Sequence, residues 1–180
     1  MKTFVGLLRA VNLAGHNAVS MADLRVFLAA IGLENPRTLL ASGNFVAGAA
    51  ARGGAQLERQ LERESAKRLK LETEFFVRTP AEWSDLVEGN TFRREAARDP
   101  ARLVVVFLKS EPAPARVTAL EGAIRGPETV RALGRHLFAY YPEGQGRSKL
   151  TAALIERHLG GPGTARNWNT VLKLHAMLES

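Results

Sequence analysis

Cysteine is absent from this 180-residue sequence, which excludes disulfide scaffolds, thiolate zinc sites, iron–sulfur clusters and cysteine nucleophiles. Long apolar runs are also lacking. The longest strongly apolar run covers residues 103–108, far short of the ~20 residues that cross a bilayer. The opening residues have neither the charged region nor the long apolar region of a signal peptide. We therefore expect a cytoplasmic protein without a membrane partner.

Acidic residues are scarcer than basic ones. The chain has 18 Asp and Glu against 25 Lys and Arg, a net charge of +7 and a pI of about 10.4. Residues 91–180 hold 14 of the basic and 8 of the acidic residues, so most of the excess lies in the second half. This balance is typical of nucleic-acid binding, but an Arg-rich and Ala-rich chain also arises from nucleotide bias in a genome. Charge alone leaves both explanations open.

The composition is that of a globular protein, with 46% hydrophobic and 24% charged residues. Apolar periodicity in the first half predicts the order β-α-β-β-α-β. The expected elements are a strand over 3–11, a helix over 21–31 with Ser20 as N-cap, strands over 37–41 and 45–47, a helix over 55–71 and a strand over 72–78. This order is the split βαβ arrangement of a ferredoxin-like unit.

The second half repeats this pattern in part. We expect a strand over 103–108, a helix over 115–124, strands over 129–133 and 136–141, and a helix over 149–159 capped by Ser148. A helix over 165–178, capped by Thr164, takes the place of a last strand. The predicted fold is α+β, with two ferredoxin-like halves whose antiparallel sheets carry helices on one face, and an extra C-terminal helix. The predicted domains are 1–88 and 102–180, joined by a polar linker over 89–101.

Residues 142–149 form a glycine-rich turn between a predicted strand and a predicted helix. Backbone N–H groups and the positive end of the helix dipole converge at such a turn, and Arg147, Ser148 and Lys149 add charge and a hydroxyl group. This pattern favours an anion site. It is not a Walker A loop, which needs Lys before the hydroxyl residue. The alternative is an ordinary turn that Ser148 merely caps.

Two further segments place polar groups at the ends of predicted elements. Arg166 and Asn169 lie on a polar, basic helix face, for which the alternative is plain solvation. Arg9 interrupts an apolar strand that ends near Asn12, so its charge needs a carboxylate partner or a cleft. The four histidines lack metal-ligand spacing, and we predict neither a metal nor a cofactor.

Five segments of the chain are together similar to a known family. They are Leu7–Gly15 (LLRAVNLAG), Met21–Leu24 (MADL), Ser42–Asn44 (SGN), Gly146–Leu150 (GRSKL) and Arg166–Val171 (RNWNTV). The sequence resembles the bacterial family called domain of unknown function 1697. Ala10 and Ala14 depart from that pattern, which has glycine at both positions. The resemblance implies an α+β architecture of ferredoxin-like halves, and it implies no activity.

We expect seven residues to border one cleft between the halves: Arg9, Asn12, Arg147, Ser148, Lys149, Arg166 and Asn169. The favoured function is a binding module for a phosphorylated or otherwise anionic ligand, either a nucleotide or RNA. The strand at residues 44–46 lacks the basic and paired aromatic residues of an RNA-recognition motif, which argues against RNA. The alternatives are an enzyme acting on a small phosphorylated or carboxylated substrate, with catalytic residues unknown, and a protein-interaction scaffold.

Overall fold

The computed structural model describes residues 1–12 and 17–180 and divides the chain into two compact units. Unit 1 comprises residues 1–85 and 174–180, and unit 2 comprises residues 86–173. Residues 13–15 of the Leu7–Gly15 segment lie outside the described residues.

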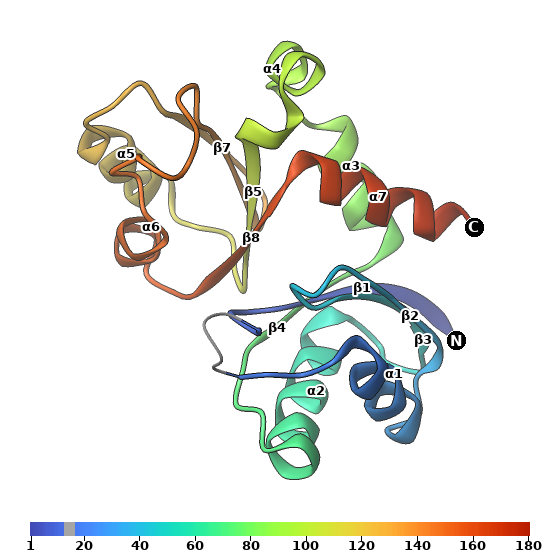
Figure 1. The fold of residues 1–180 in the computed structure, drawn as a ribbon. Coiled ribbons are helices and arrows are strands. Elements are labelled where there is room, and N and C mark those ends of the chain that lie inside the picture. Colours follow the sequence, from blue (N-terminus) through green and yellow to red (C-terminus); the bar gives the residue numbers. More distant parts are fainter. Residues whose placement is uncertain (13–16) are drawn as a thin grey trace. The chain divides into compact units, whose positions relative to one another are not determined.

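Unit 1 is built on an antiparallel sheet with the strand order β2-β3-β1-β4, and helices α1 and α2 cover one face of it (Figure 1). Its elements are β1 (Lys2–Leu8), α1 (Met21–Ala30), β2 (Glu34–Leu39), β3 (Asn44–Ala49), α2 (Gly54–Leu69) and β4 (Phe75–Arg78), followed by α3 (Pro80–Glu88). The core between sheet and helices includes Phe4, Leu8, Leu24, Phe27, Phe45, Leu57, Leu61, Phe75 and Val77.

Side chains cap two of the helix starts, those of α1 and α3, and Ser20 is the cap that the sequence predicts. The Ser20 hydroxyl accepts the Asp23 N–H at 3.0 Å. Thr79 accepts the Glu82 N–H at 3.2 Å, and the Glu82 carboxylate accepts the Thr79 N–H at 2.8 Å. This reciprocal pair is a capping box, and it satisfies N–H groups that a helix start leaves without partners.

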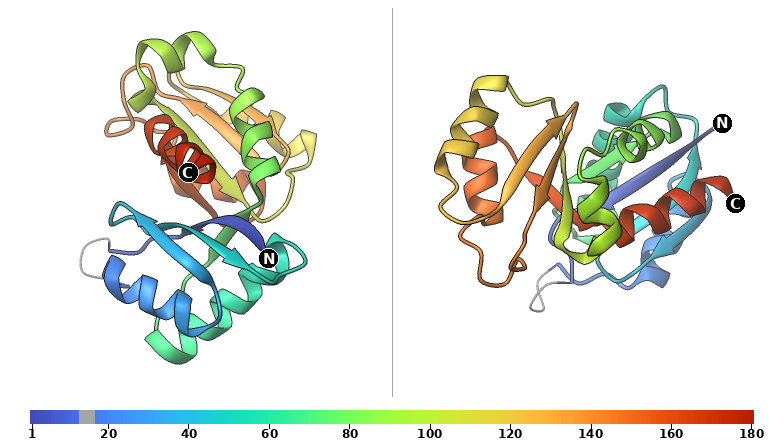
Figure 2. Two further views of the ribbon diagram at one scale, coloured as in Figure 1. Left: turned by 90° about the vertical axis from the view of Figure 1, so that its right-hand side faces the viewer. Right: turned by 90° about the horizontal axis from the view of Figure 1, so that it is seen from above.

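Unit 2 has a second antiparallel sheet, with the order β6-β7-β5-β8, and α5 and α6 lie on one face of it (Figure 2). Its elements are α4 (Arg93–Arg98), η1 (Pro100–Arg102), β5 (Leu103–Leu108), α5 (Pro114–Ala123), β6 (Thr129–Leu133), β7 (His136–Tyr140), α6 (Ala152–Leu159) and β8 (Gly163–Asn167); α7 (Trp168–Glu179) follows. The core under α5 and α6 includes Val104, Val106, Leu120, Leu137, Tyr141 and Ile155.

The predicted fold class is confirmed: each unit has the order β-α-β-β-α-β, and each sheet places the last strand beside the first. The predicted linker at residues 89–101 contains α4 and most of η1, and it is grouped with unit 2. Within the described ranges, no helix is long and apolar enough to cross a membrane.

The predicted start of the C-terminal helix is wrong. Residues 163–167 form β8, which pairs with β5, and the helix begins only at Trp168. Thr164 is therefore not the cap; Asn167 is, because its Oδ1 accepts the Thr170 N–H at 3.1 Å. Burial alternates along this segment, because Thr164 and Arg166 are buried while Ala165 between them is exposed. Such alternation is typical of a strand and not of a helix. The second half is therefore a complete β-α-β-β-α-β unit.

The predicted start of the helix over 149–159 is wrong as well. Helix α6 begins at Ala152, and Thr151 is its N-cap, with its hydroxyl accepting the Leu154 N–H at 3.2 Å. Ser148 lies in the preceding loop. Ser148 and Thr151 both have capping side chains. Leu150, which lies between them, is buried against the core before the helix begins. The helix therefore starts at the later cap.

Candidate functional site

A polar hollow of about 180 Å³ lies on unit 2 where two loops meet. One loop joins α5 to β6 and contributes residues 125–128, and the other joins β7 to α6 and contributes residues 143, 144 and 147–149. Three cations and two carboxylates line it: Arg125, Arg147, Lys149, Glu128 and Glu143. Formal charge in the hollow is therefore positive at neutral pH.

The cations face solvent. Arg147 and Lys149 are exposed, and neither forms an ion pair with another of the described residues. Arg125 donates from Nη1 to the Gly122 carbonyl oxygen at 3.2 Å, at the end of α5. An exposed cation without a carboxylate partner keeps its donors for a ligand such as phosphate.

Ser148 joins the two loops. Its hydroxyl donates to Oε1 of Glu128 at 2.5 Å and accepts the Leu150 N–H at 3.0 Å. The Glu128 carboxylate packs against Gly126, and a Cβ at position 126 would overlap the Glu128 side chain as it stands. A hydroxyl has one proton to donate, so Ser148 positions Glu128 and has no further donor for a ligand.

The backbone of the glycine-rich loop is partly used by its own turns. Gly144, with φ at +83°, donates its N–H to the Tyr141 carbonyl at 2.9 Å, and the Ser148 N–H reaches the Gln145 carbonyl at 3.1 Å. The loop is also separated from the first turn of α6, which begins at residue 152. The positive charge of the hollow therefore comes from side-chain cations and not, as expected, from N–H groups of the loop and the helix.

The other two predicted residues of unit 2 are not among those that line the hollow. Arg166 lies in β8 and is 8% exposed, with Nη1 donating to the Thr164 hydroxyl at 2.7 Å and to the Ala165 carbonyl at 2.9 Å. Burial lowers the pKa of Arg166 to about 10, so it stays charged at neutral pH. Asn169 is exposed on the first turn of α7.

The two predicted residues of unit 1 make internal contacts. The strand predicted over 3–11 ends at Leu8, so Arg9 lies just after β1, where it forms an ion pair with Glu74 at 3.3 Å. Asn12 donates to the carbonyl oxygens of Val19 at 2.8 Å and Ala41 at 2.7 Å, and its Oδ1 accepts the Val19 N–H at 2.8 Å. These bonds join the segment after β1 to Val19 before α1 and to the turn between β2 and β3. One cleft shared by all seven residues stays a prediction.

Sequence reasoning missed Arg125, Glu128 and Glu143. The Gly126-Pro127 pair beside Arg125 is a turn signal, and a cation beside a turn was the available clue. Nothing in the sequence indicated that this turn would meet the loop over 143–149. Among the described residues, no group of three or more His, Cys, Asp or Glu could hold a metal ion.

The fold and the site define an α+β protein of two β-α-β-β-α-β units with a positively charged hollow on the second. The chain belongs to the family described as "Protein of unknown function (DUF1697)", whose model matches residues 1–138. The hollow's second loop lies beyond the matched residues.

A solved structure, "conserved bacterial protein SP0830 from Streptococcus pneumoniae", has the same fold, with a TM-score of 0.77 over 98% of each chain. At 24% sequence identity, the likeness concerns the fold alone. A comparison with curated proteins gave no match.

Proposed function

We propose that this protein is a binding module for a small phosphorylated ligand, and that the hollow on unit 2 binds the phosphate. The observation that carries the proposal is the meeting of Arg125, Arg147 and Lys149 around one hollow of about 180 Å³. Arg binds phosphate oxygens through two parallel N–H donors, and Lys adds a compact charge. Three cations from two loops suit a phosphate group with several oxygens.

The burial of the aromatic residues favours a small ligand over RNA. The 8 Phe, 2 Trp and 2 Tyr side chains all lie in the described part of the chain, and all are buried. Sequence-specific recognition of single-stranded RNA relies on exposed aromatic rings on which bases stack. A ligand held by its phosphate needs no such platform.

Glu128 limits the affinity of the hollow for anions. Its carboxylate repels an anion, and the Ser148 hydroxyl fixes it in place at 2.5 Å. A doubly charged phosphate gains more from the net positive charge of the hollow than a singly charged carboxylate does, although Glu128 also repels it more strongly. The geometry therefore supports phosphate over carboxylate.

The test is isothermal titration calorimetry of the full chain with inorganic pyrophosphate and with adenosine diphosphate. Replacing Arg125, Arg147 and Lys149 together by alanine should weaken binding at least tenfold, which corresponds to about 1.4 kcal/mol. Glu128→Gln should tighten binding several-fold, because the amide keeps an oxygen for Ser148 but loses the negative charge. Thermal stability should change little in the triple variant, since exposed charges contribute little to folding.

The matched control removes the same charge elsewhere. Arg94, Arg157 and Lys173 are exposed residues of unit 2 outside the hollow, and their triple alanine variant should bind pyrophosphate as the parent does. Equal weakening in both triple variants would show a nonspecific charge effect and overturn the proposal. Tight binding of decauridylate with a steep salt dependence would favour RNA instead.

A further inference from the structure

The two units can be compared residue by residue through the pairing of their strands. Val5 of β1 opposes Arg78 of β4, and Val105 of β5 opposes Arg166 of β8. Both arginines are buried, both stand at the end of the last strand just before a helix, and both donate from Nη1 to the carbonyl oxygen of the preceding residue at 2.9 Å. Arg78 and Arg166 are therefore equivalent positions, and the neighbouring residues can be counted from them.

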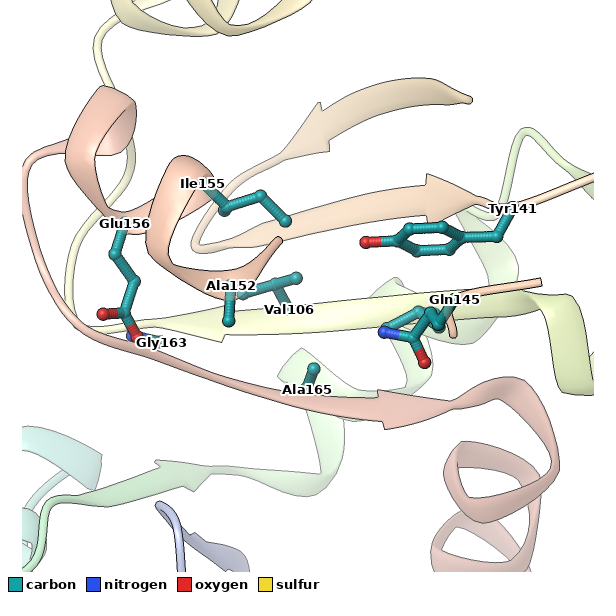
Figure 3. A pocket seen from close by; sticks show the side chains of 9 residues that line it. Val106, Tyr141, Gln145, Ala152, Ile155, Glu156, Gly163 and Ala165 are labelled. Carbon is teal, nitrogen blue, oxygen red and sulfur yellow. The ribbon is translucent and has the colours of Figure 1, made fainter. Parts of the chain in front are cut away.

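The residues three and one positions before the arginine have smaller side chains in unit 2 than in unit 1. Phe75 and Val77 of β4 correspond to Gly163 and Ala165 of β8. Phe75 and Val77 are fully buried in the core under the helices of unit 1. Gly163 and Ala165 instead line a cavity of about 50 Å³ in unit 2 (Figure 3). The cavity thus occupies space that larger side chains fill in the first unit.

The walls of this cavity are apolar. Val106 of β5 lies on one side, and Ala152 and Ile155 of α6 lie on another (Figure 3). Val104 of β5 also lines the cavity. Ala152 and Ala165 are exposed, so the cavity opens to solvent between α6 and β8. Apolar walls that are open at one side bind a short hydrocarbon chain.

Polar groups lie at the two ends. Tyr141 and Gln145 lie at one end and Glu156 at the other (Figure 3). The Tyr141 hydroxyl donates to the Leu150 carbonyl at 3.1 Å, and burial raises the pKa of this hydroxyl above its ordinary value. Oε1 of Glu156 accepts the Gly163 N–H at 3.1 Å, and a carboxylate supplies only acceptors.

We propose that this cavity is a second binding site of unit 2, and that it takes a small aliphatic ammonium compound. The alkyl chain lies against Val106 and Ile155, and the ammonium group is held by the Glu156 carboxylate. Opposite charge selects the ammonium group, and the same carboxylate rejects an alkyl carboxylate of equal size. The site is separate from the phosphate hollow and does not depend on it.

The test is a titration of the full chain, followed by ¹⁵N–¹H correlation spectra, with n-propylammonium, 1-propanol and propionate. Each of these probes has three carbon atoms, and the three differ in charge. The ammonium probe should bind at least fivefold more tightly than the alcohol, and propionate most weakly, with shifts at Ile155 and Ala165. Glu156→Gln should bring the ammonium probe to the affinity of the alcohol, because the amide oxygen can still accept the Gly163 N–H.

Two neighbouring alanines of α6 provide a matched pair. Ala152 lines the cavity and Ala153 does not, and both are exposed, so neither substitution threatens folding. Ala152→Leu should fill the mouth and weaken the binding of n-propylammonium at least tenfold, whereas Ala153→Leu should leave it unchanged. Equal affinities for all three probes, or equal binding by the two leucine variants, would overturn the proposal.

Discussion

Replacing Glu58 by alanine is expected to lower the free energy of unfolding by about 3–5 kcal/mol, because the change leaves a buried charge without its partner. The Arg78 side chain is fully buried, and its Nη1 lies 3.7 Å from Oε1 of Glu58. The same oxygen accepts the Val77 N–H at 2.8 Å. Alanine would remove the opposing charge and the acceptor together.

The location of this pair increases the effect. Strand β4 is at the edge of its sheet, where outward N–H groups lack a neighbouring strand. Glu58 and Glu62, one turn apart on α2, accept the N–H groups of Val77 at 2.8 Å and Phe75 at 3.0 Å. The two carboxylates thus take the place of a fifth strand.

Urea unfolding followed by circular dichroism measures the loss. Glu58→Gln should cost less than Glu58→Ala, since the amide oxygen still accepts the Val77 N–H. Arg63→Ala is the control, because that side chain is 70% exposed and its ion pair with Glu64 contributes at most a few tenths of a kcal/mol. A Glu58→Ala variant as stable as Arg63→Ala would contradict the role given to the buried pair.

Gly6→Ala is expected to cost about 3 kcal/mol through overpacking. Gly6 faces Phe45 on the neighbouring strand, and a Cβ at Gly6 would overlap the Phe45 ring. Phe45 is fully buried, so any shift of its ring must be accommodated inside the core. The glycine is needed here for close packing, as in other strands where an aromatic ring covers a glycine.

The control for this substitution is Gly122→Ala in α5, where an added Cβ meets nothing within 4 Å. Alanine is the better helix former, so this variant should gain about 0.5–1 kcal/mol. Adding Phe45→Leu to Gly6→Ala should recover part of the loss, because the smaller side chain makes room for the Cβ. Additive losses in the double variant would argue against the ring contact.

Local signals in the sequence predicted most of the fold. The apolar run over 103–108 and the strand predicted over 129–133 match β5 and β6, because a short apolar run and a strand bounded by turn residues are visible in a few residues. The two wrong helix starts share one cause. Ser148 and Thr164 are each followed within three residues by another capping residue, Thr151 and Asn167, and only tertiary packing decides between them.

The candidate site was less predictable because two loops distant in sequence form it. Arg147 and Lys149 could be identified from the glycine-rich loop, whereas Arg125 reaches the same hollow from the turn before β6. Arg166 was expected on an exposed helix face, and it is buried because its segment is the strand β8. A strand and a helix place the same residue in different environments, and the sequence did not distinguish them.

The most direct test of the phosphate site is to locate where pyrophosphate binds, by ¹⁵N–¹H chemical-shift mapping of the unmodified full chain. Because both loops contact the ligand, saturation should shift the amide signals of Gly126, Gly144 and Ser148 more than any others. Unchanged signals at these three amides at saturation, with the largest shifts around Arg9 and Asn12 instead, would contradict a phosphate site on unit 2.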